Sequence, residues 1–377
     1  MADVTLVSYM RRCGLMSMRL TKEQQESYTM KKALAFILAT TLCLAMLASC
    51  NKTSSPPTTE TIDKSVTITD VIGRTVTLPE PAKAVVGTHN PTLNQLIILG
   101  GGGKYIIGFG NKNMAGELYK YVYPELQNNV EQIGMGRNIN METVLLLNPD
   151  LAILPERMAD LVPMFEDVGV PVAVVLPNTE SFDTIKESLL RVATLVGATD
   201  KANEIIAFFE AKTAELKGVV ANATNRPSIL FLGGSSWLTV ANGDMLQSVM
   251  IETVGGINPA KSVQGRGDFA EVTTEQIIAW NPDVIYIPAY ASYTVESILT
   301  NPALSSIQAI KDGKVFKVPC LLEPWDYPTP SICLGLAWCV NNLYPNLYSQ
   351  SQVIKDAQDY YRLVYGMSFT AEQLGLN

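Results

Sequence analysis

The chain has 377 residues and carries 28 Lys and Arg against 36 Asp and Glu, which gives a formal net charge of −8. This acidic balance argues against nucleic acid as a partner and provides no general attraction to anionic lipid. The length is sufficient for two lobes that each bury a hydrophobic core of their own.

The first recognisable element is a short apolar segment with a basic head. Met30-Lys31-Lys32 precedes an apolar run over residues 33–48, which ends in small residues before Cys50. This pattern is typical of a signal peptide, and the run is too short for an ordinary membrane span. The Leu-Ala-Ser-Cys ending resembles a bacterial lipobox, which predicts that Cys50 is acylated and becomes the mature N-terminus. A plain secretory peptide cut nearby is the alternative.

The segments around this signal have different predicted roles. Residues 1–29 do not resemble a signal peptide, and we interpret them as an upstream extension with Met30 as the natural start. Residues 30–49 are the signal peptide, and the Pro- and Thr-rich residues 50–63 are interpreted as a flexible tether. Because several acyl chains on one Cys anchor stably, we expect an extracytoplasmic protein held on a membrane surface.

The N-terminal lobe is predicted over residues 64–198. It begins with a hairpin of two alternating strands, and short apolar strands then alternate with helices. One helix is expected over residues 92–99 and another over 182–196, where apolar residues recur at helical spacing and Gly197 ends the helix.

A long helix is predicted to join this lobe to a second one. It occupies residues 199–222, and Thr199-Asp200 is expected to cap it. At about 1.5 Å per residue it spans roughly 30 Å, which is enough to bridge two lobes. The C-terminal lobe is predicted over residues 223–377 and repeats the alternation of strands and helices.

A segment of the first lobe recurs 133 residues later, in the second lobe. Residues 142–155 and 275–288 share Glu, Asn-Pro-Asp and a final Pro at the same offsets. Each copy predicts a short helix, a turn and a strand that is buried on both faces. The repeat therefore predicts an α/β fold of two lobes, each with a mostly parallel central sheet flanked by helices, joined by a single long α-helix. Chance recurrence of a common α/β connection is the alternative.

Candidate ligand-binding residues follow from this fold, because ligands meet the carboxyl ends of parallel strands and often lie between lobes. In the first lobe the candidates are His89, Asn90, Asn111, Lys112, Arg137 and Arg157. In the second lobe they are Ser236, Trp237, Arg266, Tyr290, Tyr293, Trp325 and Tyr327. Aromatic rings suit stacking on a conjugated ligand, and the cations suit carboxylate, phosphate or catecholate groups.

Two of these residues could bind a metal. His89 is the only His in the chain and ends the first strand of its lobe. It could coordinate a metal with an open site or donate to an anion, and a structural role is the alternative. Tyr290 could provide a phenolate to ferric iron, although packing is the commoner role of Tyr. No metal ligand is certain and no cofactor is expected, although the transported ligand is expected to contain iron or cobalt.

The three Cys residues of the body carry little functional information. Cys333 and Cys339 lie in an apolar stretch and are expected as buried thiols. A disulfide from Cys320 to one of them is the alternative in an oxidising compartment. Their spacing does not resemble a zinc site.

Two other functional classes fit the sequence less well. An enzyme would need a motif that the chain lacks, because residues 233–237 do not complete a nucleophile elbow and residues 100–103 do not complete a phosphate loop. An adhesin would use Arg266-Gly-Asp268, but this tripeptide arises easily by chance. We therefore expect a binding protein without catalytic residues.

The chain resembles the substrate-binding proteins of bacterial ABC importers for chelated metals. The resemblance covers roughly residues 64–365 and is carried by the lipobox, the opening VTITDVIGRTVTLP of residues 66–79, the two lobes and the lone bridging helix. It implies a monomer that captures a ferric siderophore, cobalamin or haem and delivers it to a permease dimer with a cytoplasmic ATPase. Some similar proteins bind oxyanions such as molybdate or tungstate with arginines and a His, so an oxyanion is the alternative ligand.

The resemblance also gives the two repeat glutamates a role. In the vitamin B12-binding member, a Glu on each lobe docks to permease arginines, and the matching motifs here are Asn140-Met-Glu142 and Val272-Thr-Thr-Glu275-Gln276. A carboxylate in a first helical turn is favoured by the helix dipole. One such carboxylate on each lobe would set the orientation in which the protein docks on the permease and the rate at which the two associate. Capping of their own helices is the alternative.

Overall fold

The computed structural model describes residues 64–376, apart from 113–115, 266–267 and 320. The predicted extension, signal peptide and tether, with Cys50, lie outside the described residues, and so do Arg266 and Cys320. Within the described ranges, no helix has both the length and the apolar character that crossing a membrane requires.

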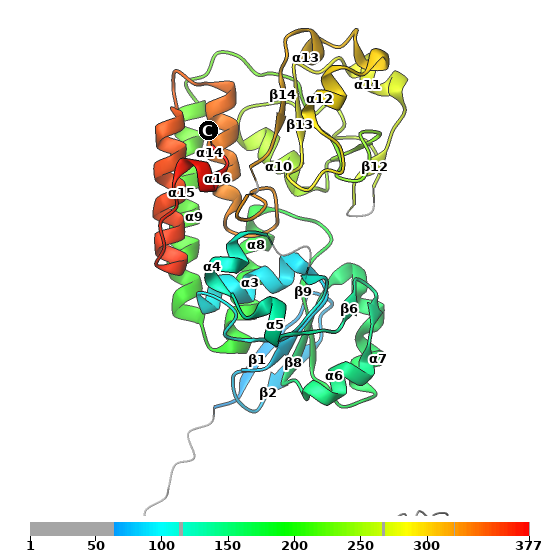
Figure 1. Ribbon diagram of the computed structural model, residues 1–377, viewed down its shortest axis with the longest axis vertical. Helices are drawn as coiled ribbons and strands as arrows, with labels where there is room; N and C mark the ends of the chain where they lie inside the picture. The colour runs from blue at the N-terminus through cyan, green and yellow to red at the C-terminus, as the bar shows by residue number, and fades with distance from the viewer. Residues whose placement is uncertain (1–63, 113–115, 266–267, 320, 377) are drawn as a thin grey trace, which may run out of the picture. The chain divides into compact units, whose positions relative to one another are not determined.

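A five-stranded parallel sheet forms the centre of the N-terminal lobe (Figure 1). In sheet order its strands are β5 (Glu131–Gln132), β4 (Ile106–Phe109), β3 (Val85–Val86), β8 (Leu151–Pro155) and β9 (Val172–Leu176). All neighbouring pairs are parallel. Strands β8 and β9 are buried at every residue, as expected of strands covered by helices on both faces.

Helices and two small hairpins surround this sheet. The hairpins are β1 (Val66–Thr69) with β2 (Thr75–Leu78), which was predicted, and β6 (Gly134–Met135) with β7 (Asn138–Ile139). The helices are α3 (Asn90–Gly100), α4 (Leu118–Val122), α5 (Leu126–Asn129), α6 (Met141–Leu147), η2 (Glu156–Leu161), α7 (Val162–Glu166) and α8 (Phe182–Val196). Helix α8 has its predicted bounds because Ser181 forms a capping box with Thr184, and Gly197 ends the helix at a φ of 68°. Helix α3 begins two residues earlier than predicted.

The C-terminal lobe is built on a smaller parallel sheet. Its order is β10 (Ile229–Phe231), β13 (Val284–Ile287) and β14 (Val315–Lys317). A separate antiparallel pair joins β11 (Thr239–Val240) to β12 (Ala270–Glu271). The helices of this lobe are α10 (Leu246–Thr253), α11 (Thr274–Trp280), α12 (Val295–Leu299), η3 (Pro302–Leu304) and α13 (Gln308–Lys311). The predicted α/β class with two mostly parallel sheets is confirmed.

The repeated Asn-Pro-Asp sequence makes the same connection in both lobes. Asn148 ends α6 and Asn281 ends α11, each in the left-handed region, at φ of 48° and 40°. The following Asp accepts a backbone hydrogen bond from the neighbouring strand segment. Asp150 accepts from the amide of Ala84 at 2.9 Å, and Asp283 accepts from the amide of Ser228 at 2.8 Å. The motif therefore ends a helix and ties the strand that follows it into the sheet.

The long helix α9 (Thr199–Val220) connects the two lobes and lies beside α8, α14 (Ile332–Leu343) and α15 (Gln350–Tyr365) (Figure 1). The predicted cap is wrong, because Ala198 occupies the N-cap position and Thr199 and Asp200 lie in the first turn. Helix α15 also contacts α3 of the N-terminal lobe, and the chain ends with α16 (Ala371–Leu374). The C-terminal helices therefore contact both lobes and the helix between them.

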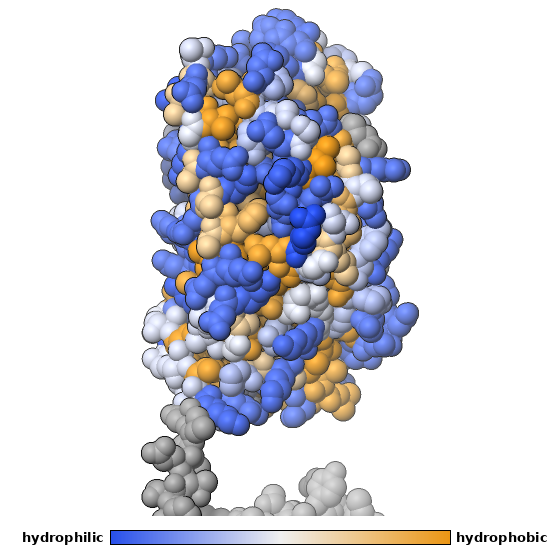
Figure 2. All heavy atoms as spheres, turned by 90° about the vertical axis from the view of Figure 1, so that its left-hand side faces the viewer, coloured by the Kyte–Doolittle hydropathy of each residue, from blue (hydrophilic) through white to orange (hydrophobic). Residues whose placement is uncertain are grey.

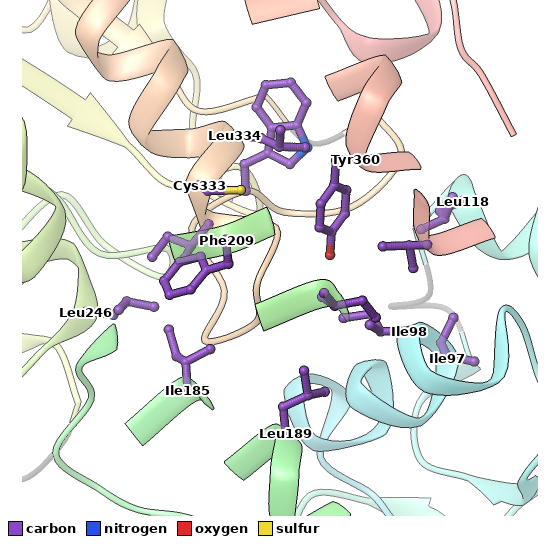
Figure 3. Close-up of a cluster of buried hydrophobic side chains, with 14 of the residues drawn as sticks. Ile97, Ile98, Leu118, Ile185, Leu189, Phe209, Leu246, Cys333, Leu334 and Tyr360 are labelled. Atoms are coloured by element: carbon purple, nitrogen blue, oxygen red, sulfur yellow. The ribbon is translucent and has the colours of Figure 1, made fainter. Parts of the chain in front are cut away.

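One hydrophobic cluster runs through both lobes around α9. Figure 3 shows Phe209 of α9 among Ile185 and Leu189 of α8, Leu246 of α10 and Leu334 of α14. The ring of Phe209 packs edge-on against Phe182, with centroids 5.4 Å apart. Each sheet also has a cluster of its own on another face. The lobes are thus joined by a shared core as well as by the chain of α9.

The cysteines of α14 belong to this shared core. Cys333 and Cys339 are both buried free thiols, as expected from their apolar surroundings.

On the outside of the helices, hydrophilic side chains predominate, with apolar ones in scattered patches (Figure 2).

A buried ion pair adds a polar link between α9 and α15. Lys212 Nζ lies 2.7 Å from Asp356 Oδ1 and 2.6 Å from Glu215 Oε2. Tyr348 donates its hydroxyl proton to the same Asp356. Because Asp356 is buried, removing its carboxylate would leave the Lys212 ammonium without its enclosed partner.

We therefore expect Asp356→Ala to lower the free energy of unfolding by about 3 kcal/mol, measured by urea denaturation. Asp359→Ala is the matched control, one turn later on α15, where the carboxylate pairs with Lys355 and Arg362 at the surface. The control should lose less than about 1 kcal/mol. Equal losses in the two variants would show that the Lys212 pair adds nothing to the attachment of α15.

Candidate functional site

A cavity of about 810 Å³ lies between loops of the two lobes. A volume of several hundred Å³ is typical of small-molecule sites. On the N-terminal side its walls come from the segments after β3, β4, β8 and β9, which supply His89, Asn111, Arg157 and Glu180. The predicted rule that carboxyl ends of strands face the cleft therefore holds for this lobe.

The same rule holds for the C-terminal lobe. Gly234 and Ser235 follow β10, and Tyr290 and Ser292 follow β13. The loop after β14 supplies Asp326, Tyr327 and Pro328, and α10 contributes Met245 and Gln247 at its start. Both sheets thus direct their carboxyl ends at one cavity.

The structure brings six of the predicted site residues together in the cavity wall. They are His89, Asn90, Asn111, Arg157, Tyr290 and Tyr327. Ligand contact by these side chains stays a prediction. Met135 and Gly136 also line the wall, and Gly136 is held there because its carbonyl accepts a hydrogen bond of 2.6 Å from Thr88 Oγ1.

The predicted cations Lys112 and Arg137 lie outside the cavity wall. Lys112 Nζ donates to the carbonyl of Val130 at 2.6 Å. Arg137 pairs with Asp160 and donates to the carbonyl of Arg157 at 2.7 Å. Both side chains are therefore engaged with the loops that support the wall.

Four further candidates of the C-terminal lobe have structural surroundings. Ser236 Oγ accepts from the amide of Leu238 at 3.1 Å, and Trp237 packs at the edge of the lobe's own hydrophobic cluster. Tyr293 donates to the carbonyl of Gly233 at 2.6 Å. Trp325 is 1% exposed, and its Nε1 donates to the hydroxyl of Tyr361 at 3.0 Å. The last candidate, Arg266, lies outside the described residues.

His89 and Arg157 form a close pair on the N-terminal side. Arg157 Nη2 lies 2.6 Å from His89 Nε2, and because a guanidinium only donates, the imidazole nitrogen accepts. Burial and the positive charge of Arg157 hold the pKa of His89 well below its ordinary value. The imidazole is therefore neutral. Its Nδ1 is buried and has no hydrogen-bond partner in the described part of the chain.

Acidic side chains from both lobes form the acidic side of the cavity, and sequence reasoning missed them as candidates. They are Glu180, Asp268, Glu271 and Asp326. Asp326 is 1% exposed, and neither of its carboxylate oxygens has a hydrogen-bond partner among the described residues. Burial raises the pKa of Asp326 to about 7 and Glu180 adds to this rise, while the nearby Gln247 side chain and the backbone amide of Asp326, both outside hydrogen-bond geometry, oppose it.

Glu180 is perturbed in the same direction. Desolvation raises the pKa of its carboxyl to about 7, although Arg157 and a backbone hydrogen bond from Leu246 act against the rise. Asp326 lies in the strand-end loop that also supplied Trp325 and Tyr327 as candidates, whereas no candidate was taken from the loop after β9, which holds Glu180. For Asp326 the signal was therefore present, but only cations, aromatic residues and polar amides were selected from it.

Two tyrosines form an aromatic corner beside the carboxyl groups. The rings of Tyr290 and Tyr327 lie 5.5 Å apart at their centroids, and Tyr290 is 39% exposed. Desolvation and the negative charges of Asp326, Glu180 and Asp268 raise the pKa of Tyr290 well above its ordinary value. The phenol is therefore neutral in the absence of a metal, and its predicted role as a phenolate ligand of iron stays a prediction. Among the described residues, no three His, Cys, Asp or Glu side chains are grouped to hold a metal ion.

Residues 100–320 match the family model of the periplasmic binding proteins. The chain belongs to the periplasmic binding protein family. This confirms the predicted relationship to the substrate-binding proteins of ABC importers, so the partners are a small-molecule ligand and a membrane permease. The family consists of solute-binding proteins rather than enzymes.

Several relatives match most of the chain. The molybdate-binding protein MolA of Haemophilus influenzae is 26% identical, over 80% of this chain and 91% of its own length. A probable siderophore-binding lipoprotein of Bacillus subtilis is 21% identical, over 77% of this chain and 91% of its own length. The vitamin B12-binding protein of Yersinia pestis is 26% identical over 56% of this chain and 72% of its own length.

Solved structures share the fold. MolA bound to molybdate superposes with a TM-score of 0.71 at 26% identity, covering 81% of this chain and 99% of that one. The Ni-His complex of CeuE from Helicobacter pylori gives a TM-score of 0.69 at 16% identity, covering 82% and 98%. Because its sequence identity is only 16%, the likeness to CeuE supports the fold alone.

The raised pKa of Asp326 predicts a pH-dependent effect of Asp326→Asn. Asp326 is ionised in the unfolded chain above about pH 4 but stays protonated in the folded protein until about pH 7. The wild type therefore loses stability, relative to the variant, as the pH rises through this window. We compare the free energies of unfolding of Asp326→Asn and the wild type by urea denaturation. The value for the variant minus the value for the wild type should be greater at pH 8 than at pH 5, by at most about 3 kcal/mol.

Asp359→Asn is the control for this measurement. The ion pair with Lys355 lowers the pKa of Asp359, so this variant should gain no stability at pH 8. If the difference in the free energy of unfolding between the wild type and Asp326→Asn is the same at pH 5 and pH 8, Asp326 is not an enclosed carboxylate.

Proposed function

We propose that this protein captures a metal chelate in the cavity between its lobes and delivers it to an ABC permease. A ferric siderophore is the foremost ligand, with cobalamin or haem as related choices. The observation that carries the proposal is the cavity itself, about 810 Å³ and lined from both lobes. At about 30 Å³ per water-sized group, it has room for roughly two dozen non-hydrogen atoms. Outer parts of a larger chelate would extend into solvent.

The charge of the wall narrows the kind of chelate. Arg157 is the one Lys or Arg among the described residues of the wall, which also carries four carboxyl groups. A strongly anionic catecholate complex would meet repulsion on the acidic side. Three hydroxamates neutralise a ferric ion, so a hydroxamate chelate avoids this repulsion. The rings of Tyr290 and Tyr327 would contact its apolar parts.

A small oxyanion such as molybdate or tungstate is the second candidate. It is favoured by the similarity to MolA, whose name and structure record molybdate binding. The pair of His89 and Arg157 lies at the start of α3, where a helix N-terminus also attracts negative charge. An oxyanion there would occupy only the N-terminal side of the cavity.

Docking to the permease through Glu142 and Glu275 remains part of the proposal. Both carboxylates are exposed in the first turns of α6 and α11, where Asn140 and Thr273 serve as the N-caps. Apolar side chains are exposed about one turn further along each helix, with Leu146 at 82% and Ile278 at 37%. A carboxylate beside an exposed apolar residue on each lobe supports a two-point protein interface.

Attachment to the membrane through an acylated Cys50 also remains a proposal, as does the monomeric state. Two of the relatives from Bacillus subtilis are lipoproteins by name. The lipid would keep the binding protein close to its permease, which raises the rate at which the two meet.

The ligand can be identified by native mass spectrometry and metal analysis of protein purified from its own cells. We expect one metal chelate per chain. Arg157→Ala and Tyr290→Ala should each weaken its binding by about tenfold, since each removes a polar or aromatic contact worth roughly 1–2 kcal/mol. Arg191→Ala, on α8 outside the cavity wall and paired with Glu187, is the control and should bind normally. A bound molybdate would support the second candidate instead, and wild-type affinity in both cavity variants would contradict this site.

The docking proposal predicts that Glu142→Ala combined with Glu275→Ala abolishes import while leaving ligand affinity intact. Import can be measured with a radiolabelled ligand in cells that carry the cognate permease. Glu187→Ala combined with Glu296→Ala removes two other exposed carboxylates and should import normally. Import at the wild-type rate by the Glu142 and Glu275 variant, at low protein concentration, would contradict the assigned docking residues.

A further inference from the structure

The acidic side of the cavity contains a carboxylate that the protein itself does not satisfy. Asp326 is 1% exposed and lines the cavity, and both of its side-chain oxygens lack a hydrogen-bond partner among the described residues. A buried carboxylate without a partner is costly, so such groups are normally paired. The partner of Asp326 is therefore to be sought in what enters the cavity.

The groups around Asp326 make this side of the cavity attractive to positive charge. Glu180 and Asp268 line the same wall and come from two other segments of the chain. All three carboxyl groups act electrostatically on the phenol of Tyr290. Arg157, the one cation among the described residues of the wall, acts on Glu180 and on His89, with which it is paired.

We propose that Asp326, Glu180 and the face of Tyr290 form a subsite for a primary ammonium group of the ligand. The two unpartnered oxygens of Asp326 would accept hydrogen bonds from the ammonium. The rings of Tyr290 and Tyr327 provide an aromatic surface on which a cation is also favoured. The proposal rests on the proposed function and deepens it, because it specifies a chelate that carries a free amine.

The subsite explains why the acidic groups are tolerated. An ammonium between Asp326 and Glu180 would replace the hydration that both carboxylates lose on burial. The neighbouring cation Arg157, paired with His89, remains available for an oxygen-rich part of the same ligand. A molecule with a chelated metal at one end and an amine at the other would satisfy both sides.

Binding of the amine should also depend on pH. Asp326 faces Glu180, and Glu180 faces Arg157 and Asp268, with the phenols of Tyr290 and Tyr327 beside them. Near pH 6 the two enclosed carboxyls are mostly protonated and accept an ammonium poorly, while at pH 8 they are mostly ionised. Affinity for the ammonium should therefore rise with pH, by roughly tenfold between pH 6 and pH 8.

The test uses three probes in isothermal titration calorimetry with the purified protein. The first is the ferric complex of a linear trihydroxamate that ends in a primary ammonium, and the second is the same complex with this amine acetylated. The third is 1,5-diaminopentane, which carries ammonium groups and no metal. The wild type should bind the ammonium chelate at least tenfold more tightly than the acetylated one, as expected for charge-assisted hydrogen bonds.

Two variants test the residues. Asp326→Asn and Glu180→Gln keep the shape of each side chain and remove its charge, and both should reduce the preference for the ammonium chelate to within about twofold. Circular dichroism and the affinity for the acetylated chelate show that each variant is folded. Glu296→Gln, on the exposed face of α12, is the matched control and should keep the full preference.

The outcomes separate the subsite from the proposed function. Equal affinity of the wild type for both chelates would overturn the subsite and leave chelate capture standing. If neither chelate binds but the diamine does, and Asp326→Asn loses it, the subsite holds and the proposed metal chelate is wrong. If none of the three probes binds, the subsite and the assignment of a hydroxamate chelate are both overturned.

Discussion

The arrangement of the cavity depends on the hydrophobic cluster that α9 shares with both lobes. Phe209 packs against α8 on one side, and α10 and α14 complete the cluster on the other (Figure 3). A hinge that opened the lobes widely would have to expose these side chains, at about 25 cal/mol for each Å² of apolar surface. The buried pair of Lys212 and Asp356 adds a polar link between α9 and α15. The cavity is therefore largely formed before a ligand arrives, and its selectivity depends on fixed groups in its walls.

Those fixed groups divide the cavity into two sides of opposite character. Arg157 and the neutral His89 lie at the start of α3, where the helix dipole adds positive potential. Asp326 of the C-terminal lobe and Glu180, which interacts with both Asp326 and Arg157, form the acidic side, and their raised pKa values show that the protein encloses them at a cost. Enclosed carboxyl groups that lower stability are expected where binding gains from them. The acidic side gives this cavity a property that an oxyanion would not use.

Most of the fold could be predicted from local sequence, because its signals are short-range. The Asn-Pro-Asp repeat fixed two helix ends and two strands, and Ser181 and Gly197 fixed the ends of α8. The strand-end rule also selected loops of both lobes that line the cavity, although the loop after β9 with Glu180 was not among them. It could not tell which side chain of a loop faces the cavity, since Trp325 is buried with Tyr361 while the adjacent Asp326 lines the wall. That choice depends on packing between segments distant in the chain, which a single sequence does not reveal.

A crystal structure of the protein loaded with its natural ligand tests the account most directly. We predict one metal chelate in the cavity, in contact with Arg157 of the N-terminal lobe and with Tyr290 and Asp326 of the C-terminal lobe, in lobes arranged as they are here. Density for a ligand outside the cavity, or for one that touches a single lobe, would contradict it.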